Sequence, residues 1–260
     1  MTDVEVADTF VLPDGRDVWC PNATEAEAVW AEMGADSPYV AAARGLRSGD
    51  VVIDVGAHVG MASMVFADTA PGVEIYAFEP APATADCLQR NLAAHVPAAV
   101  VLRQAVGARP GTHSFTYYPV TSSRSTLYVD DIDDELNQEA YFTNQAVPEA
   151  DRDIIRQLNG IAVQLTVDVT TVSDLVRANG LRSIGLLKID VERAEHEVLR
   201  GVSDSDWPLV RRVLIEVHDI DGRLGHIVAR LATLGFSVTT TQPGSFRGGS
   251  VYTVLASRPA

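Results

Sequence analysis

The chain has 260 residues, 47% of them hydrophobic, and a formal net charge of −15 at pH 7. This length and composition allow one α/β domain with a large core. Because nucleic-acid binding depends mostly on Lys and Arg contacts to phosphates, the acidic balance argues against DNA, RNA and anionic membrane surfaces as partners. No apolar run reaches the roughly 18 residues of a membrane span. We expect a cytoplasmic protein that acts on a small molecule, and the sequence leaves open whether it forms a homodimer.

The N-terminal residues predict no export signal, and the two cysteines predict no disulfide chemistry. Residues 1–8 are acidic and lack a signal-peptide pattern. The two cysteines, Cys20 and Cys87, have no metal-ligand spacing, and we expect them to be buried, inert thiols.

Residues 1–47 predict a small N-terminal cap. Strands over 10–12 and 16–19 flank a Pro-Asp-Gly turn, which is typical of a β-hairpin. Asn22 is placed to cap a helix over 24–33, and a second short helix is expected over 38–44.

Residues 48–260 predict a Rossmann-like domain. The apolar run 51–55 is typical of a central strand buried on both faces. Helices and further strands then alternate, which indicates βαβ units and a mostly parallel sheet. The other strands are expected over 73–78, 99–103, 184–189 and 210–217, and a closing hairpin over 236–241 and 251–256. An insertion at about 112–165 interrupts this rhythm with one extra strand over 112–118, and we interpret it as a lid.

The loop that follows the first central strand predicts a nucleoside site. Glycines at 56 and 60 allow a tight turn close to a ligand, and Glu79 ends the next strand, where a carboxylate can bind both ribose hydroxyls. Asp54 stands just before the loop, where it would repel a diphosphate and attract the ammonium of a methionine moiety. This difference favours S-adenosylmethionine over NAD. The next strand end places Gln104 and Ala105 beside the adenine.

Two later strand ends predict the site of chemistry. Lys188 and Asp190 share one side of the fourth strand, and Glu216 and His218 share one side of the fifth. Lys188 is the only lysine in the chain, which suggests that a compact ammonium is needed there, paired with Asp190 or Glu216. His218 is the candidate general base at neutral pH, although a core histidine is an open alternative.

The acidic run 130–135 is a weak indication of a metal. It lacks the turn glycine and spacing of a calcium loop, so we predict a solvated lid segment and no metal site. A requirement for a divalent metal is left open as the alternative. Nearby aromatic residues form either a wall for the acceptor or part of the core: Tyr117, Tyr118, Tyr141 and Phe142.

Over nearly its whole length the chain resembles the FkbM family of methyltransferases. The resemblance lies in the motifs at 52–60, 77–80, 105–107, 171–175, 186–192 and 216–218, of which Lys-Ile-Asp-Val-Glu is the most specific. It implies a class I methyltransferase fold with a mostly parallel seven-stranded sheet and a C-terminal antiparallel hairpin. It also implies O-methylation in natural-product pathways and donor contacts at Asp54, Gly56, Glu79 and Gln104.

The sequence departs from the family at two positions. His58 stands where the family usually has Asn, and is still expected to reach the donor carboxylate. Arg193 stands where the family usually has Gly, which puts the turn after Glu192 in question.

Three other functions stay open. The acceptor atom could be nitrogen or carbon instead of oxygen. An NAD-dependent oxidoreductase is disfavoured by Asp54 and by the missing third glycine of the dinucleotide-binding motif. A non-catalytic cofactor-binding protein is disfavoured by the intact set of Asp54, Gly56, Glu79 and Asp190.

Overall fold

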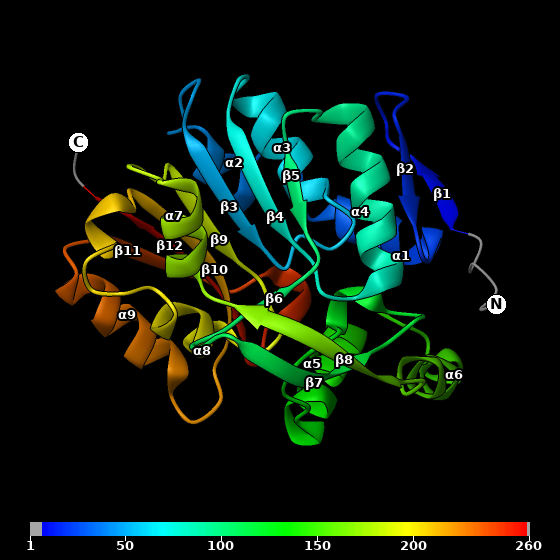
Figure 1. Ribbon diagram of the computed structural model, residues 1–260. Helices are drawn as coiled ribbons and strands as arrows, with labels where there is room; N and C mark the ends of the chain where they lie inside the picture. The colour runs from blue at the N-terminus through cyan, green and yellow to red at the C-terminus, as the bar shows by residue number, and fades with distance from the viewer. Residues whose placement is uncertain (1–6, 259–260) are drawn as a thin grey trace.

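The computed structural model describes residues 7–258 and shows a three-layer α/β fold (Figure 1). The outermost residues of the predicted regions, 1–6 and 259–260, lie outside the described part, as does most of the acidic N-terminal segment. A seven-stranded sheet has the order β11-β12-β10-β9-β3-β4-β5, and only β12 runs against the other strands. Its strands are β3 (Val51–Val55), β4 (Glu74–Phe78), β5 (Val100–Leu102), β9 (Leu186–Ile189), β10 (Arg212–His218), β11 (Ser237–Thr241) and β12 (Val251–Ser257). The predicted parallel sheet and closing hairpin are confirmed.

Helices cover both faces of this sheet. One face carries α2 (Pro38–Ala43), α3 (Met61–Thr69) and α4 (Pro82–His95), and the other carries α7 (Val172–Asn179), α8 (Glu195–Arg200) and α9 (Arg223–Thr233) (Figure 1). Each face has its own buried apolar cluster. Strand β3 is buried at every residue, as its continuous apolar run predicts.

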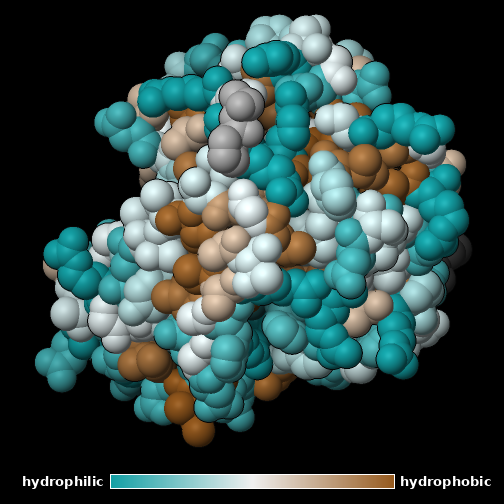
Figure 2. Space-filling model, turned by 90° about the vertical axis from the view of Figure 1, so that its left-hand side faces the viewer, coloured by the Kyte–Doolittle hydropathy of each residue, from teal (hydrophilic) through white to brown (hydrophobic). Residues whose placement is uncertain are grey.

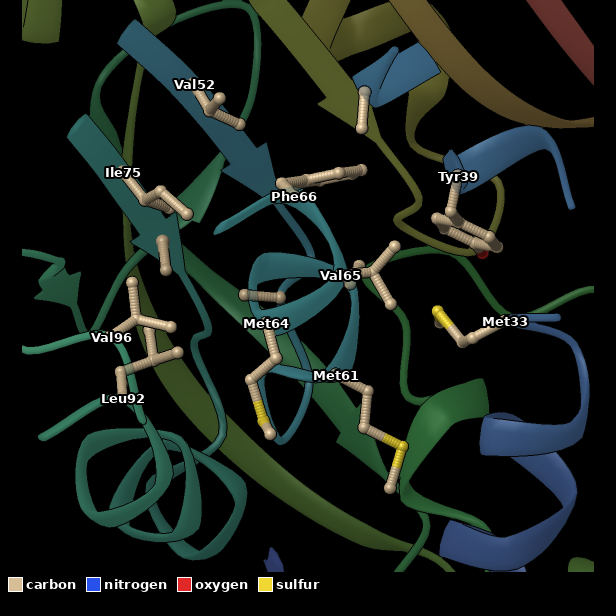
Figure 3. Close-up of a cluster of buried hydrophobic side chains, with 14 of the residues drawn as sticks. Met33, Tyr39, Val52, Met61, Met64, Val65, Phe66, Ile75, Leu92 and Val96 are labelled. Carbon is tan, nitrogen blue, oxygen red and sulfur yellow. The ribbon is translucent and has the colours of Figure 1, made fainter. Parts of the chain in front are cut away.

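Figure 3 shows how α3 fills the space beside the sheet. Met64 and Phe66 are 0% exposed and pack with Val52 and Ile75 of the neighbouring strands. Burial of one such side chain stabilises the fold by about 1.5–3 kcal/mol. This packing fixes the start of α3, and with it the loop between β3 and α3.

The N-terminal segment packs on the same apolar cluster as α3. It forms the hairpin β1 (Asp8–Val11) and β2 (Asp17–Cys20), then α1 (Ala23–Ala31) and α2. The Asn22 side chain accepts the N–H groups of Thr24 and Glu25, so the predicted helix cap is confirmed. Leu12 and Val18 are buried in the shared cluster. The division into a cap and a main domain stays a prediction.

The insertion contains a second sheet that the sequence analysis missed. Strand β8 (Val163–Thr170) lies between β6 (Ala105–Val106) and β7 (Gly111–Tyr117). This eight-residue strand begins inside the expected insertion, at residue 163, and extends past its expected end at about 165. Alternation of Val163, Leu165, Val167 and Val169 with polar residues was the available signal.

The remaining insertion elements are a short 3-10 helix η1 (Ser122–Arg124) and the helices α5 (Asp131–Asn144) and α6 (Glu149–Asn159). Together with the second sheet they lie below the carboxyl ends of β3 and β4 in Figure 1. Two further 3-10 helices are η2 (Trp207–Leu209) and η3 (Gly244–Phe246). The insertion thus stands at the edge of the sheet where α/β proteins bind ligands.

The outer surface is mostly polar. On the face with α9 and β11, hydrophilic residues surround several apolar patches (Figure 2). Among residues 7–258, no helix combines the length and apolar character that a membrane crossing requires.

Candidate active site

A pocket of about 1150 Å³, including its opening, lies at the carboxyl ends of the central strands. It is lined by the loop after β3, the ends of β4 and β5, the turn after β9 and the insertion segment 122–127. We call it the donor pocket. The predicted site residues in its lining are Gly56, His58, Glu79, Gln104, Ala105, Lys188, Asp190 and Glu216. Asp54, Gly60 and His218 are not in its lining.

In the loop after β3, the backbone N–H groups of Gly56, Ala57 and His58 already donate hydrogen bonds within the protein. Those of Gly56 and Ala57 donate to the Phe78 carbonyl at 3.1 and 2.8 Å, and that of His58 donates to Glu79 Oε2 at 3.1 Å. Dinucleotide-binding loops instead aim free N–H groups at the pyrophosphate. The loop geometry therefore argues against NAD.

Gly56 is required by a close backbone approach. Its φ is 75°, and a Cβ atom there would lie 1.7 Å from the carbonyl oxygen of Asp190. A side chain at this position would separate the loop from the turn after β9. Gly56 thus holds the donor loop against the residues predicted to perform the chemistry.

Glu79 is buried and faces the donor pocket. Its exposed fraction is 7%, and its Oε1 accepts the N–H of Ala81 at 3.0 Å while Oε2 accepts that of His58. Burial raises its pKa to about 7, against the effect of these two N–H groups. Two oxygens held in fixed positions with lone pairs to spare suit a pair of ribose hydroxyls.

Gln104 and Ala105 line the donor pocket, and their contact with the adenine stays a prediction. Ala105 begins β6 in the second sheet, and the Gln104 N–H donates to the Leu102 carbonyl at 2.9 Å. Apolar side chains of Phe78, Phe115 and Leu127 also line this end of the pocket. The surface suits a flat, mostly apolar ring.

Asp54 does not reach the pocket, contrary to the predicted contact with the donor. It is 0% exposed, its Oδ2 accepts the Ser63 hydroxyl at 2.7 Å, and its Oδ1 lies 3.1 Å from Lys188 Nζ. The carboxylate is therefore an anchor for the lysine behind the loop.

Lys188 connects the donor loop to the turn after β9. Its Nζ donates to the Gly56 carbonyl at 2.6 Å and lies 3.4 Å from Asp190 Oδ2. Burial opposes its charge, but Asp54 and Asp190 raise its pKa above the ordinary value. The predicted pairing with Asp190 is confirmed, whereas the pairing with Asp54 was not foreseen.

Gly60 has a packing role. Its φ is 94°, it precedes α3, and a Cβ atom there would lie 2.8 Å from Leu88 of α4. Because it lies outside the pocket lining, the structure gives no support to the predicted donor contact.

His58 links the donor loop to the insertion. Its Nε2 lies 2.7 Å from the hydroxyl of Ser122, which donates to Glu25 Oε2 at 2.8 Å. Burial lowers the pKa of His58. The ring therefore points toward the insertion and the N-terminal cap, and its contact with the donor carboxylate stays a prediction.

A second pocket of about 740 Å³ shares a wall with the donor pocket. Its other walls come from α2, β10 and the segment around η3. The shared residues are Glu32, Tyr39, Lys188, Asp190 and Glu216. We call it the acceptor pocket, because a molecule in it would face a donor across these side chains. Sequence reasoning missed Glu32 and Tyr39, whose hydroxyl donates to Asp190 at 3.4 Å.

His218 lies behind this wall in a network of charged groups. It is 4% exposed, its Nδ1 lies 2.7 Å from Asp133 Oδ2, and its Nε2 lies 3.2 Å from Glu192 Oε2. Burial works against its charge, yet Glu192 and Asp133 raise its pKa well above the ordinary value. His218 also lines neither pocket. The predicted role of a free base in contact with the acceptor therefore does not fit this environment.

The acidic run 130–135 is only partly a solvated segment. Asp130 caps α5, and Ile132 is 83% exposed, as a lid surface would be. Asp133 is 5% exposed, accepts from Arg193 Nε at 2.9 Å and also bonds the hydroxyl of Ser250. The expectation of a solvated run is wrong for Asp133, which turns inward to hold His218.

Arg193 occupies a left-handed turn that a glycine would adopt without strain. Its φ is 79° and that of Glu192 is 51°, a left-handed conformation that strains ordinary residues. Its guanidinium pairs with both Asp133 and Asp134, and its N–H donates to Glu195 at 2.6 Å. These contacts hold the strained backbone in place.

The four aromatic residues near the insertion do not form a wall of either pocket. Tyr117, Tyr118, Tyr141 and Phe142 are absent from both pocket linings. Phe115 of β7 and Phe246 of η3 line the donor pocket instead.

Comparison with known proteins agrees with this architecture. Residues 54–238 match the model of the methyltransferase FkbM domain. The chain is 39% identical over 258 residues to the 31-O-demethyl-FK506 methyltransferase FkbM of Streptomyces tacrolimicus, covering 98% of this chain and 99% of that one. It is 34% identical to the methyltransferase sdnD of Sordaria araneosa, with 83% of each chain covered.

A solved structure shows the same fold. The methyltransferase FkbM from Methylobacillus flagellatus KT superposes with a TM-score of 0.52 at 11% identity, over 80% of this chain and 44% of that one. The chain thus spans less than half of that longer protein. From the domain match and the 39% identity, this chain belongs to the FkbM family of methyltransferases.

Proposed function

We propose that the protein transfers a methyl group from S-adenosylmethionine to a hydroxyl group of a small natural product, a polyketide, peptide or glycoside. The observation that carries the proposal is the wall that the donor and acceptor pockets share, where Asp190 and Glu216 face both. The name of the Streptomyces relative, a 31-O-demethyl-FK506 methyltransferase, supports oxygen as the acceptor atom.

The donor pocket fits this nucleoside better than a dinucleotide. Glu79 offers two fixed carboxylate oxygens for the ribose, and Ala105 and Phe78 offer apolar surface for the adenine. The loop keeps no free N–H groups at Gly56, Ala57 or His58 for a pyrophosphate. When bound, the donor supplies a methyl group already activated by its sulfonium.

The protein's contribution is then mainly alignment. Holding two reactants in line contributes roughly 7–11 kcal/mol of barrier reduction. Lys188 Nζ lies 3.4 Å from Asp190 Oδ2, and the Tyr39 hydroxyl donates to the same oxygen at 3.4 Å. We assign to Asp190 and Glu216 the orientation of the acceptor hydroxyl and the removal of its proton. His218, which lies outside both linings, is a positioning residue in this proposal.

Binding and product analysis test the proposal in two steps. Calorimetry with S-adenosylmethionine, S-adenosylhomocysteine and NAD is expected to detect binding of the first two only. Methyl transfer from labelled donor to hydroxylated macrolides is then expected to give an O-methyl ether, identified by NMR. Preferential binding of NAD, or a methyl group on nitrogen or carbon, would contradict it.

A matched pair of variants separates the two pockets. Asp190→Asn is expected to lower turnover by about 10²–10⁴-fold, the usual contribution of a general base, while S-adenosylhomocysteine affinity changes little. Glu79→Ala is expected to weaken the affinity for S-adenosylhomocysteine itself.

The same proposal includes a small-molecule acceptor, no nucleic-acid partner and a cytoplasmic location. The net charge of −15 supports it.

A further inference from the structure

A group of side chains suited to a metal ion lies beside the wall that the two pockets share, and Glu216 belongs to both. Ligand atoms of Glu192, Glu216 and His218 all lie within 4.8 Å of one another. We propose that these three residues bind a divalent cation of the Mg²⁺ and Mn²⁺ class. The sequence analysis predicted no metal site, and the acidic run 130–135 that it considered contributes none of the three ligands.

His218 has the environment of a metal-binding histidine. Its side chain is 4% exposed, and Nδ1 is held at 2.7 Å by the carboxylate of Asp133. Histidines that bind metals usually give their second nitrogen to a carboxylate in this way, which fixes the ring and leaves the other nitrogen free to coordinate. Nε2 of His218 makes no hydrogen bond with any described residue.

The position of Nε2 agrees with coordination. It lies 3.2 Å from Glu192 Oε2 without hydrogen-bond geometry. Two ligands at right angles on an ion with bonds of about 2.1 Å are about 3 Å apart. The pair is therefore spaced as neighbouring ligands of one ion.

Glu216 completes the set. Its side chain makes no hydrogen bond or ion pair with residues 7–258, and it lines both pockets. An ion pair between His218 and Glu192 alone leaves this carboxylate without a partner. Two cations line the donor pocket with Glu192 and Glu216, and both are already paired: Lys188 with Asp54 and Asp190, and Arg124 with Asp134. A bound divalent ion would balance Glu192 and Glu216 together.

The ligand types select the class of ion. Two carboxylates favour Mg²⁺ and Mn²⁺, and one imidazole nitrogen favours Mn²⁺ within this class. Three protein ligands leave coordination positions open, and one of the ligands, Glu216, lines the acceptor pocket. If the proposed function holds, an acceptor hydroxyl can occupy one of these positions and lose its proton more readily.

The test measures metal binding on the full chain, without methyl transfer. After removal of metals with EDTA, Mn²⁺ is titrated and the free ion is followed by electron paramagnetic resonance. We expect one Mn²⁺ per chain, displaced by Mg²⁺. Absence of binding at millimolar Mn²⁺, or failure of Mg²⁺ to displace it, would overturn the site.

Variants locate the ion. Glu192→Gln and Glu216→Gln are expected to weaken Mn²⁺ binding at least tenfold, and Asp133→Asn by about 10–100-fold, as for other partners of metal-binding histidines. Glu32→Gln removes a carboxylate from the same pockets outside the group and is expected to change the affinity less than threefold. Equal effects in all four variants would mean general charge attraction and overturn the site.

Two controls keep the results interpretable. Thermal unfolding without metal identifies a variant that fails to fold, in which case the other Glu→Gln variant and the wild-type titration decide. S-adenosylhomocysteine binding is measured in parallel. Donor binding without Mn²⁺ binding overturns the metal site alone, whereas Mn²⁺ binding without donor binding overturns the proposed methyl donor.

Discussion

The donor and acceptor sides of the site are held together by contacts of different range. On the donor side, Glu79 bonds the backbone of His58, 21 residues away, and Asp54 bonds Ser63, 9 residues away. On the acceptor side, His218 bonds Asp133 at a separation of 85 residues, and Asp190 meets Tyr39 at 151. The bonds of Glu79 and Asp54 thus arise within one βαβ unit, although Lys188 and Ser122 also reach the donor loop over 132 and 64 residues. The bonds of His218 to Asp133 and of Asp190 to Tyr39 on the acceptor side are both long-range.

Lys188 contacts both the donor loop and Asp190. Its substitution is therefore expected to have the largest effect on the free energy of unfolding. Lys188→Met leaves Asp54 and Asp190 as buried or half-buried carboxylates without a cation. Breaking a buried ion pair from one side costs about 3–5 kcal/mol. We expect a loss of this size in the free energy of unfolding, measured by urea denaturation.

Arg177→Met is the matched control for a surface pair. Arg177 pairs with Asp174 at 2.7 Å, but its side chain is 75% exposed. Such pairs contribute about 0–1 kcal/mol. If the two variants lose the same stability, Lys188 does not join the two sides in the way the structure indicates.

Arg193 tests the acceptor side alone. Arg193→Ala removes the partner of buried Asp133 and keeps the strained turn, so we expect a loss of about 3 kcal/mol. Arg193→Gly removes the same pairs but relieves the strain, which is about 1–3 kcal/mol for such a conformation. The glycine variant should therefore be the more stable of the two by about 1 kcal/mol in urea denaturation. The reverse order would show that the φ of 79° carries no cost.

The sequence predicted the donor side well because the required residues follow one another along the chain. Gly56, Glu79 and Ala105 stand at successive strand ends, and parallel strands bring these ends to one edge. Asp54 was expected at the donor because it stands just before the loop, but its place along the chain does not say whether the loop covers its side chain. Its partners Ser63 and Lys188 close it off from the pocket.

The sequence identified the charged residues of the acceptor side but did not give their roles. Lys188, Asp190, Glu216 and His218 were identified as charged residues at strand ends, which is a local signal. The role of His218 depends on Asp133 in α5, and no pattern in either segment indicates that they meet. The acidic run looked solvated because its helix has both exposed and buried positions, and their assignment requires the packing of α5 against Ser250.

Glu79 is expected to make the stability of the folded protein depend on pH. Its pKa in the folded protein is about 7, above the value of 4.5 for a free side chain, because burial disfavours its charge. The folded state thus binds the proton more tightly, so this group's contribution to stability is complete below pH 4.5 and is lost as the pH rises through 7.

The expected slope is at most about 1.4 kcal/mol per pH unit for one proton. Glu79→Gln should remove this part of the decline between pH 5 and 7.5, measured as the difference in unfolding free energy between variant and wild type at each pH. Glu74→Gln, an exposed position on the same strand, is the control and should leave the difference flat. A flat difference for Glu79→Gln as well would mean that the carboxyl is not desolvated by the loop.

The Asn22 side chain makes one local and one distant contact, so its variants can compare the two kinds of contact at a single residue. Its oxygen caps α1, as predicted, and its Nδ2 donates to the Val120 carbonyl at 2.9 Å, 98 residues away in the insertion. Asn22→Ser keeps the cap and loses the distant bond, whereas Asn22→Ala loses both. We expect Asn22→Ser to lower the free energy of unfolding by about 0.5–1.5 kcal/mol relative to wild type. We expect Asn22→Ala to lower it by about 1 kcal/mol more, the usual contribution of a cap.

Because the distant bond ties the N-terminal cap to the insertion, the serine variant should also speed hydrogen exchange in residues 118–125. Unchanged exchange there would mean that the insertion is held by the Glu25 contacts to Ser122 and Ser123 instead.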